Sequence, residues 1–331
     1  MANFGIGYKG SKNKLADKII NLFPPKTNFY DLFAGGCSIT HAAILSGKYK
    51  YIFCNDIQPD IINLFNDAIH GRYKNERRWI SKEDFFNLKD KDPYIKYCWS
   101  FGNMGKTYLY AQEIEPYKKA LHYAIIFNDF SQLEKLYPAA SFEFLQGETD
   151  TQKRRLLLQN YFKNSGVASG SPLESSADAA SILQSLTRLQ SLERLENLER
   201  LNKLENLERL NKLENLERLA FCTLSYDEVK IKSDSVIYCD IPYKDTDNYN
   251  DMEFDFDSFY KWAGKQTEPL FISSYEMPAD QFITVAEIPH RCTLQQNKND
   301  SEVIERVFIP RHQLAQYKAT RPQPLLFDDI L

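Results

Sequence analysis

Residues 29–56 read FYDLFAGGCSITHAAILSGKYKYIFCND and decide the fold. Residues 29–33 form a short strand-like run, which ends at the turn Ala34-Gly35-Gly36. Residues 38–45 then predict a helix, and residues 51–54 predict a second strand. A strand, a glycine turn, a helix and a further strand form the repeating unit of parallel sheets that are covered by helices.

The flanking segments extend this pattern in both directions. Apolar residues at helical spacing predict two further helices, at 12–22 and 59–69. Sheet-like runs return at 235–239, 269–274, 282–288 and 303–309. Residues 72–161 are instead charged, rich in aromatic residues and mostly helical in pattern, and a Gly/Ser stretch follows at 165–172. The sequence therefore predicts one α/β sheet domain that is split by an inserted helical lobe.

The composition excludes several classes of protein. Of the 331 residues, 43% are hydrophobic and 14% are aromatic, which supports a packed core and excludes wholesale disorder. The formal net charge is -4, so any nucleic-acid site has to be a local patch. The apolar runs are far shorter than the ~20 residues of a membrane-spanning helix, and the amino terminus has no apolar signal core. We expect a soluble, cytoplasmic protein without a membrane partner.

The six cysteines lie far apart in the sequence. They form no C-x-x-C pair, and no histidine stands at zinc-ligand spacing from them. We therefore expect reduced thiols, no disulfide and no bound metal.

A tandem repeat interrupts the sheet domain. Leucine occupies every third position of 186–219, and the unit LERLNKLEN recurs from Leu198 and Leu207. A spacing of three turns an α-helix by about 300°, so the leucines circle the helix and form no coiled-coil seam. Seven acidic residues balance seven basic ones in this segment, which excludes an electrostatic DNA clamp. Its conformation stays open, and a spacer without chemistry is the plain interpretation.

Residues 236–243 read VIYCDIPY, a buried strand that delivers Asp240, Pro242 and Tyr243 to the edge of a sheet. The lone pair of an exocyclic amine is delocalised into its ring. A carboxylate and a backbone carbonyl that accept its two N–H groups localise the lone pair for attack, while an adjacent aromatic ring stacks on the base. A turn with a capping Asp and a packing Tyr is the alternative, so the motif has to be weighed with others.

Two amino-terminal motifs complete the pattern. A glycine turn after the first strand lets a cofactor approach the backbone, and an acidic residue about twenty positions later, at the end of the next strand, holds a ribose diol. Gly35 and Asp56 have this spacing. Upstream of both stands the segment Tyr8-Lys9-Gly10-Ser11-Lys12.

In this order, the motifs resemble those of the Dam-type class of DNA adenine-N6 methyltransferases. That family has a W-x-G-x-K element, an F-x-G-x-G turn, a target-recognition insertion and a D-P-P-Y motif. The resemblance covers residues 4–70 and 221–312. It implies a Rossmann-like sheet sandwiched by helices, with S-adenosylmethionine as methyl donor. The expected segments are two parts of the methyltransferase domain at 1–71 and 220–312, a mostly helical target-recognition insertion at 72–185, the repeat at 186–219 and a flexible tail at 313–331.

The resemblance assigns roles to residues at the matching positions. Its catalytic motif corresponds to Asp240, Ile241, Pro242 and Tyr243. Contact with the donor is implied for Tyr8, Lys12, Asp31, Phe33, Ala34, Gly35, Asp56 and Asp240, with Asp56 at the ribose.

This chain departs from the family pattern at four places. Tyr8 replaces a tryptophan and offers a smaller stacking surface, and Cys37 replaces the second glycine of the turn, where we expect crowding. Ile241 replaces the first proline of D-P-P-Y, so its carbonyl is still an acceptor but the turn is less rigid. Ser225-Tyr226 stands where many relatives have an acidic residue before an aromatic one.

We therefore expect a site-specific DNA methyltransferase of the restriction-modification type that acts on adenine N6. The target base is expected to flip out of the duplex, to stack on Tyr243 and to be held at N6 by Asp240 and the Ile241 carbonyl. Two alternatives stay open. One is a cytosine-N4 methyltransferase on the same fold, against which Asp at position 240 counts, and the other is a degenerate domain that only binds DNA or a clamp.

The inserted lobe contains the candidate DNA contacts. Residues 72–79, RYKNERRW, interleave basic and aromatic side chains, and a solvated helix face explains Arg77 and Arg78 equally well. Residues 99–108 weakly resemble the recognition loop of the family and contain Asn103, Lys106 and Tyr108. Basic side chains there are expected to hold phosphates while Asn103 or an aromatic ring reads or wedges a base. We expect double-stranded DNA as the partner of this protein, and we expect the protein to be a monomer.

The carboxyl-terminal tail suggests a second partner. The segment from Gln323 to Phe327, QPLLF, resembles the Q-L-x-L-F peptide with which bacterial proteins dock on the DNA sliding clamp. Proline stands where leucine is usual, so clamp binding is a hypothesis.

Overall fold

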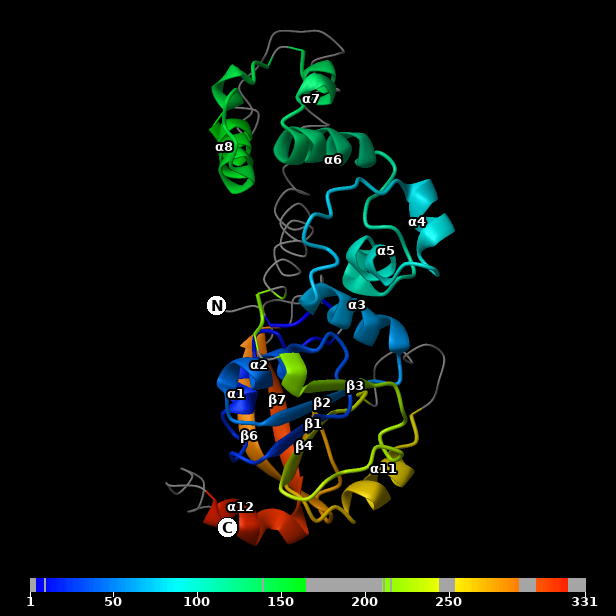
Figure 1. Ribbon diagram of the computed structural model, residues 1–331, viewed down its shortest axis with the longest axis vertical. Coiled ribbons are helices and arrows are strands. Elements are labelled where there is room, and N and C mark those ends of the chain that lie inside the picture. The colour runs from blue at the N-terminus through cyan, green and yellow to red at the C-terminus, as the bar shows by residue number, and fades with distance from the viewer. Residues whose placement is uncertain are drawn as a thin grey trace. The chain divides into compact units, whose positions relative to one another are not determined.

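The computed structural model describes residues 4–8, 10–138, 140–164, 210, 212–214, 216–243, 254–291 and 302–320 (Figure 1). Most of the leucine repeat, Cys292 and the segment from Gln323 to Phe327 lie outside these residues. The chain divides into two compact units. The sheet unit comprises Met1–Arg72 and Asn206–Leu331, and the helical unit comprises Tyr73–Glu205.

A seven-stranded sheet organises the sheet unit. Its strands are β1 (Asn28–Asp31), β2 (Tyr51–Asn55), β3 (Leu219–Cys222), β4 (Ser235–Asp240), β5 (Leu270–Ser274), β6 (Phe282–Arg291) and β7 (Glu302–Pro310). They lie in the order β3-β2-β1-β4-β5-β7-β6, and β7 runs antiparallel to both of its neighbours. The remaining pairs, from β3 to β5, are parallel. This is the predicted Rossmann-like methyltransferase fold.

Both faces of the sheet are buried, as a parallel sheet requires. Side chains alternate along β4, so that Val236 and Tyr238 belong to one apolar core while Ile237 and Cys239 belong to the other. Helices supply the opposing side chains of each core. They are α1 (Ala16–Ile20), α2 (Ser38–Ser46) and α12 (Leu314–Ala319) for the first core and α11 (Phe256–Ala263) for the second.

Local sequence signals set the ends of these helices. The last helix of the amino-terminal segment, α3 (Pro59–Ile69), has proline in its first turn, where no N–H is needed. Gly47 follows α2 at φ +64° in the left-handed region, and Asp255 caps α11 by accepting a hydrogen bond from the Ser258 N–H. Helix α12 occupies the start of the stretch that was expected to be a flexible tail and buries Tyr317 against Phe271.

The helical unit contains short elements, as its sequence pattern predicts. They are α4 (Lys82–Leu88), α5 (Pro93–Cys98), η1 (Phe101–Asn103), α6 (Glu115–His122), η2 (Tyr123–Phe127), α7 (Ser131–Leu136), η3 (Glu143–Leu145) and α8 (Thr151–Asn164). The elements from α6 to α8 share one apolar core that includes Leu133, Leu145 and Leu158. Buried Arg154 holds this core together, because its guanidinium donates to the Ile125 and Glu148 carbonyls at 2.8 and 2.6 Å.

Within the described ranges, no helix has the length and apolar character needed to span a membrane.

Candidate active site

The carboxyl ends of β1 and β4 meet in the middle of the sheet. The two strands pair in parallel, with Asp31 opposite Tyr238. After β1 the chain moves outward through β2 to β3, whereas after β4 it moves to β5 on the other side. Ligands of open α/β sheets bind at the carboxyl edge where the strand order reverses in this way. The glycine turn after β1 and the D-I-P-Y motif after β4 therefore share one edge.

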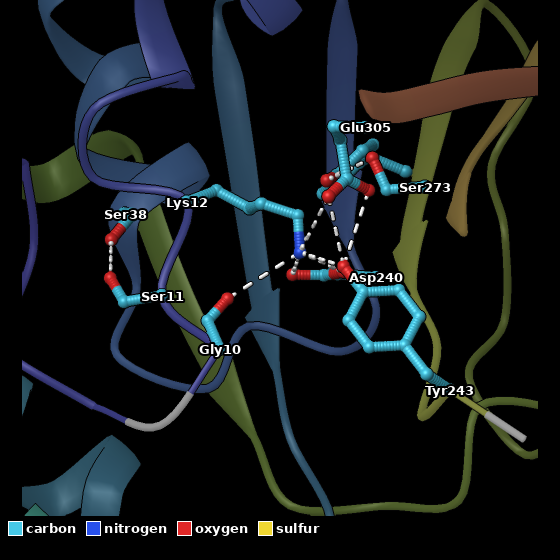
Figure 2. A network of polar contacts seen from close by, with 9 residues as sticks. Gly10, Ser11, Lys12, Ser38, Asp240, Tyr243, Ser273 and Glu305 are labelled. Carbon is cyan, nitrogen blue, oxygen red and sulfur yellow. Dashed lines mark hydrogen bonds and ion pairs between the residues drawn. The ribbon is translucent and has the colours of Figure 1, made fainter. Parts of the chain in front are cut away.

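Lys12 joins the amino-terminal motif to D-I-P-Y (Figure 2). Its Nζ donates to both carboxylate oxygens of Asp240, at 2.7 and 2.9 Å, and to the hydroxyl oxygen of Tyr243 at 2.7 Å. The Lys12 side chain is only 6% exposed, whereas that of Asp240 is 20% exposed. The buried ammonium of Lys12 thus fixes Asp240 and Tyr243, which belong to the same sequence motif. The side chain of Asp240 is still partly accessible to solvent.

Glu305, on β7, is a fourth member of this cluster and was missed in the sequence. The hydroxyl of Tyr243 donates to its two carboxylate oxygens at 3.2 and 3.0 Å, and Lys12 Nζ lies 3.8 Å from Oε2. Its side chain is 1% exposed. Glu305 shares the period-two face of Val307 and Ile309, which are both buried, so an acid on an otherwise apolar face was the available signal.

Burial and charge shift the pKa values of the cluster. Burial, reinforced by Glu305 and opposed by Lys12, raises the pKa of Asp240 to about 6. Burial alone would lower the pKa of Lys12, but the carboxylates of Asp240 and Glu305 raise it well above its ordinary value. Burial, with Asp240 and Glu305, also raises the pKa of Tyr243 far above its usual range. At neutral pH, Lys12 is therefore an ammonium, Asp240 is a carboxylate and Tyr243 keeps its proton.

The glycine turn is close-packed against the amino-terminal segment. Gly35 has φ +46°, and a Cβ added to it would lie 3.2 Å from the ring of Tyr8. A Cβ on Gly36 would overlap the carbonyl oxygen of Ile6. Cys37 adopts the left-handed φ of 57° that a glycine takes without strain, and its buried Sγ lies 3.6 Å from that of Cys54. Cys37 thus adopts the backbone conformation that the turn requires, and its side chain is buried in the core.

The predicted ribose acid is tied to this turn. Asp56 accepts hydrogen bonds from the N–H of Gly35 at 2.7 Å and from the N–H of Gln58 at 2.9 Å. Burial raises the pKa of Asp56, against these two bonds. The N–H of Ala34 donates to the Asn55 carbonyl at 2.9 Å, which joins the ends of β1 and β2.

Asp31 is the last residue of β1, just before the turn, and one of its carboxylate oxygens accepts hydrogen bonds. Its Oδ2 accepts from the N–H and hydroxyl of Thr40 at 3.0 and 2.7 Å. Its Oδ1 is buried, and no hydrogen-bond partner for it occurs among the described residues. Burial raises the pKa of Asp31 to about 7, against the Thr40 bonds. Such an oxygen is suited to a cationic or N–H group of a bound ligand.

Phe33 and Tyr226, the second residue of the Ser225-Tyr226 pair, form an aromatic wall at the same edge. The rings of Phe33 and Tyr226 stack with centroids 5.5 Å apart and planes 25° apart. Phe254 and Phe259 pack against both rings at their edges. Tyr226 is therefore a packing partner of Phe33, a contact that the sequence did not reveal.

The helical unit holds the five candidate DNA contacts in different environments. The Arg78 guanidinium is paired with Glu76 at 2.7 Å, and Arg77 donates to the Glu76 carbonyl at 2.9 Å. Tyr108 is buried, and its hydroxyl donates to the Ile80 carbonyl at 2.7 Å. Lys106 is exposed. Asn103, which has φ 57°, is half-buried, and its Oδ1 lacks a hydrogen-bond partner among the described residues.

The family comparison covers the amino-terminal motifs and most of the helical unit. The D12 class N6 adenine-specific DNA methyltransferase family matches residues 8–181, which is more than half of the chain. Members of this family methylate adenine rather than cytosine, and a DNA methyltransferase of this kind implies S-adenosylmethionine as donor and DNA as substrate. The predicted fold, enzyme class and reaction are confirmed. The chain belongs to the D12 class of N6 adenine-specific DNA methyltransferases.

Proposed function

We propose that the cluster of Lys12, Asp240 and Tyr243 is the methyl-transfer site for an adenine that has rotated out of double-stranded DNA. A base inside the duplex cannot bring N6 to a donor in a protein pocket, so the nucleotide has to be extruded. The observation that carries the proposal is the pair of hydrogen bonds from Lys12 Nζ to Asp240 and Tyr243. They place a carboxylate and an aromatic ring together at the carboxyl edge of β4.

The residues at this edge fit S-adenosylmethionine. An added Cβ at Gly36 would overlap a backbone oxygen, the Oδ1 of Asp31 is without a partner among the described residues, and Asp56 lies at the end of β2. In this proposal Asp31, Asp56 and the turn hold the donor, with Tyr8, Phe33 and Ala34 around them. When bound, the donor supplies a methyl group on a positively charged sulfur.

Asp240 has the central chemical role in this scheme. One N–H of N6 donates to its carboxylate and the other to the Ile241 carbonyl, which localises the nitrogen lone pair toward the methyl group. Pro242 limits the turn, and the ring of Tyr243 stacks on the adenine. Asp240 Oδ is placed to accept the proton that N6 would release as the bond from N6 to the methyl carbon forms and the bond from that carbon to sulfur breaks, with the electron pair remaining on the sulfur. Lys12 keeps Asp240 ionised above a pH of about 6, because it opposes the effect of burial on the pKa.

We also propose that the helical unit recognises the target, with Lys106 at a phosphate and Asn103 at a base. The exposure of Lys106 supports this assignment, as does the Oδ1 of Asn103, which has no hydrogen-bond partner in the part of the chain that the structure describes. Arg77, Arg78 and Tyr108 stay candidates, and their present bonds to Glu76 and Ile80 support a role in shaping the same unit.

The clamp hypothesis is retained as a separate proposal, as is a monomeric state. A labelled peptide with the sequence of Gln323 to Phe327 should bind the sliding clamp in fluorescence anisotropy if the tail docks there. No change in anisotropy would dispose of the idea without affecting the methyl-transfer site.

The decisive experiment is mass analysis of nucleosides from DNA that was incubated with the protein and S-adenosylmethionine. Wild-type protein should yield N6-methyladenine, and Asp240→Asn should lower the rate by about three orders of magnitude or more, because the carboxylate charge is lost. Asp257→Asn, at an exposed position of α11, is the matched control and should keep the wild-type rate. An active Asp240→Asn protein would refute the assigned role.

A further inference from the structure

Glu305 and Lys12 both hold the hydroxyl of Tyr243. Because Tyr243 keeps its proton, its hydroxyl donates to Glu305 while it accepts from Lys12 Nζ. The direction of both hydrogen bonds is thereby fixed, and so is the position of the ring that carries the hydroxyl (Figure 2). A buried carboxylate bonded in this way has a defined orientation and no access to solvent.

The cluster contains more negative than positive charge. Lys12 contributes one ammonium, while Asp240 and Glu305 contribute two carboxylates. His290, on the neighbouring β6, adds no positive charge at neutral pH, because burial and the charges of Lys12 and Lys14 lower its pKa. Arg306, next to Glu305 in sequence, is occupied elsewhere, with bonds to Glu287 and to the Tyr275 carbonyl. This cluster therefore has one negative charge in excess, in addition to the carboxyl groups of Asp31 and Asp56 at the same edge of the sheet.

We propose that Glu305 is a positioning residue that also makes the site prefer the cationic methyl donor to its neutral product. It acts through Tyr243 and Lys12, since it bonds the first and attracts the second. The sulfur of S-adenosylmethionine is positively charged, whereas that of S-adenosylhomocysteine is neutral, so an excess negative charge stabilises only the first. This inference rests on the proposed methyl-transfer site and adds a means of releasing the product.

Binding measurements on the intact protein test the charge effect without relying on turnover. Calorimetry should give, for wild-type protein, a lower Kd for S-adenosylmethionine than for S-adenosylhomocysteine. In Glu305→Gln the acceptor for Tyr243 is kept and the charge is removed, so the ratio of the two Kd values should fall about tenfold. Sinefungin, whose amine carries a positive charge in place of the sulfonium, should lose affinity together with the donor.

Two further variants separate charge from position. Glu305→Asp keeps the charge but is too short for the bond to Tyr243, so it should retain the Kd ratio while kcat falls about tenfold. Glu287→Gln removes a charge from the exposed surface of the same β6-β7 hairpin and should change neither quantity. If Glu305→Gln does not fold, the wild-type protein still decides the question, because equal Kd values for donor and product would overturn the proposed preference.

The binding measurements distinguish a failure of the role of Glu305 from a failure of the methyl-transfer site. Equal loss of affinity for donor and product in Glu305→Gln, or no loss at all, would overturn the role of Glu305 while leaving the methyl-transfer site intact. A wild-type protein that binds neither ligand would refute the methyl-transfer site, and the inference would fall with it.

Discussion

The phenol rings of Tyr243 and Tyr275 stack with their centroids 4.1 Å apart and their planes at 16°. Tyr275 follows β5, and its carbonyl accepts a hydrogen bond from Arg306 on β7 at 2.8 Å. One face of Tyr243 is therefore supported by a second ring, and its hydroxyl is fixed by Lys12 and Glu305. Tyr243 is restrained along both its plane and its long axis, as a platform for a stacked base requires.

Replacement of Tyr275 should weaken DNA use without affecting the donor. Tyr275→Leu removes a stacking contact worth about 0.5–1.5 kcal/mol, so KM for DNA should rise about two- to tenfold. The Kd for S-adenosylmethionine should stay at its wild-type value. Tyr51→Leu, at an exposed position of β2, is the matched control for both measurements. A Tyr275→Leu protein with reduced donor affinity and normal KM would contradict this account.

The pH dependence of methylation should report Asp240. Because its pKa is about 6, kcat/KM should be constant above pH 7 and fall tenfold per unit of pH well below 6. Lys12 favours the ionised form of Asp240, so Lys12→Gln should raise this pKa and move the acid limb to higher pH. The measurement is a profile of kcat/KM between pH 5 and 9 for both proteins. An acid limb at the same pH in the two profiles would count against the coupling.

Asp31 should make the free protein less stable as the pH rises. Its folded pKa of about 7 exceeds the ordinary value near 4, so the folded state binds more protons between these limits. The free energy of unfolding should therefore fall from pH 4 to pH 7, by an amount on the order of 4 kcal/mol for this group alone.

Asp31→Asn should remove this dependence. The variant is expected to be more stable than wild type at pH 8 and to differ little from it at pH 4, as measured by urea unfolding without donor. The exposed Asp17→Asn is the control. A difference between Asp31→Asn and wild type that does not change with pH would show that Asp31 is not the source.

Two glycines with similar backbone angles should respond differently to alanine. Gly5 has φ +65°, and an added Cβ would overlap the Gly36 carbonyl oxygen. Gly47 has φ +64°, and no atom of the described residues lies within 4 Å of a Cβ added there. Gly47→Ala should lower the free energy of unfolding by only about 1 kcal/mol. Gly5→Ala has to displace the segment that bonds Ile6 to Gly36, so it should also weaken donor binding at least about tenfold. Similar donor affinity in the two variants, measured by calorimetry, would disprove the close fit.

Much of the sheet could be predicted because its central strands are buried on both faces. Consecutive hydrophobic residues follow one another around Phe29 in β1 and around Val236 in β4, without the alternation of a strand buried on one face only, and an acid ends each strand. Strand β3 was missed, since it lies at the edge of the sheet, is only partly buried and begins at Leu219, the last leucine of the repeat.

Site residues that lie in contiguous motifs could be predicted from the sequence, whereas site residues outside these motifs were missed. Asp240 and Tyr243 share one motif, so chemistry alone pointed to them. Glu305 and Tyr275 belong to no recognisable motif, and a charged residue in a strand usually lies at the surface. Only the pairing of β7 with β5 brings Glu305 to Lys12, and a single sequence contains no record of that pairing.

The residues of the cluster are far apart in the sequence, and this separation determines when the cluster can form during translation. Lys12 precedes the helical unit in the chain, whereas its partner Glu305 follows that unit. A ribosome therefore has to translate the whole helical unit before the ammonium can acquire both counterions. Nascent or prematurely terminated chains therefore contain the glycine turn without a competent methyl-transfer centre, and incomplete protein should leave the genome unmodified.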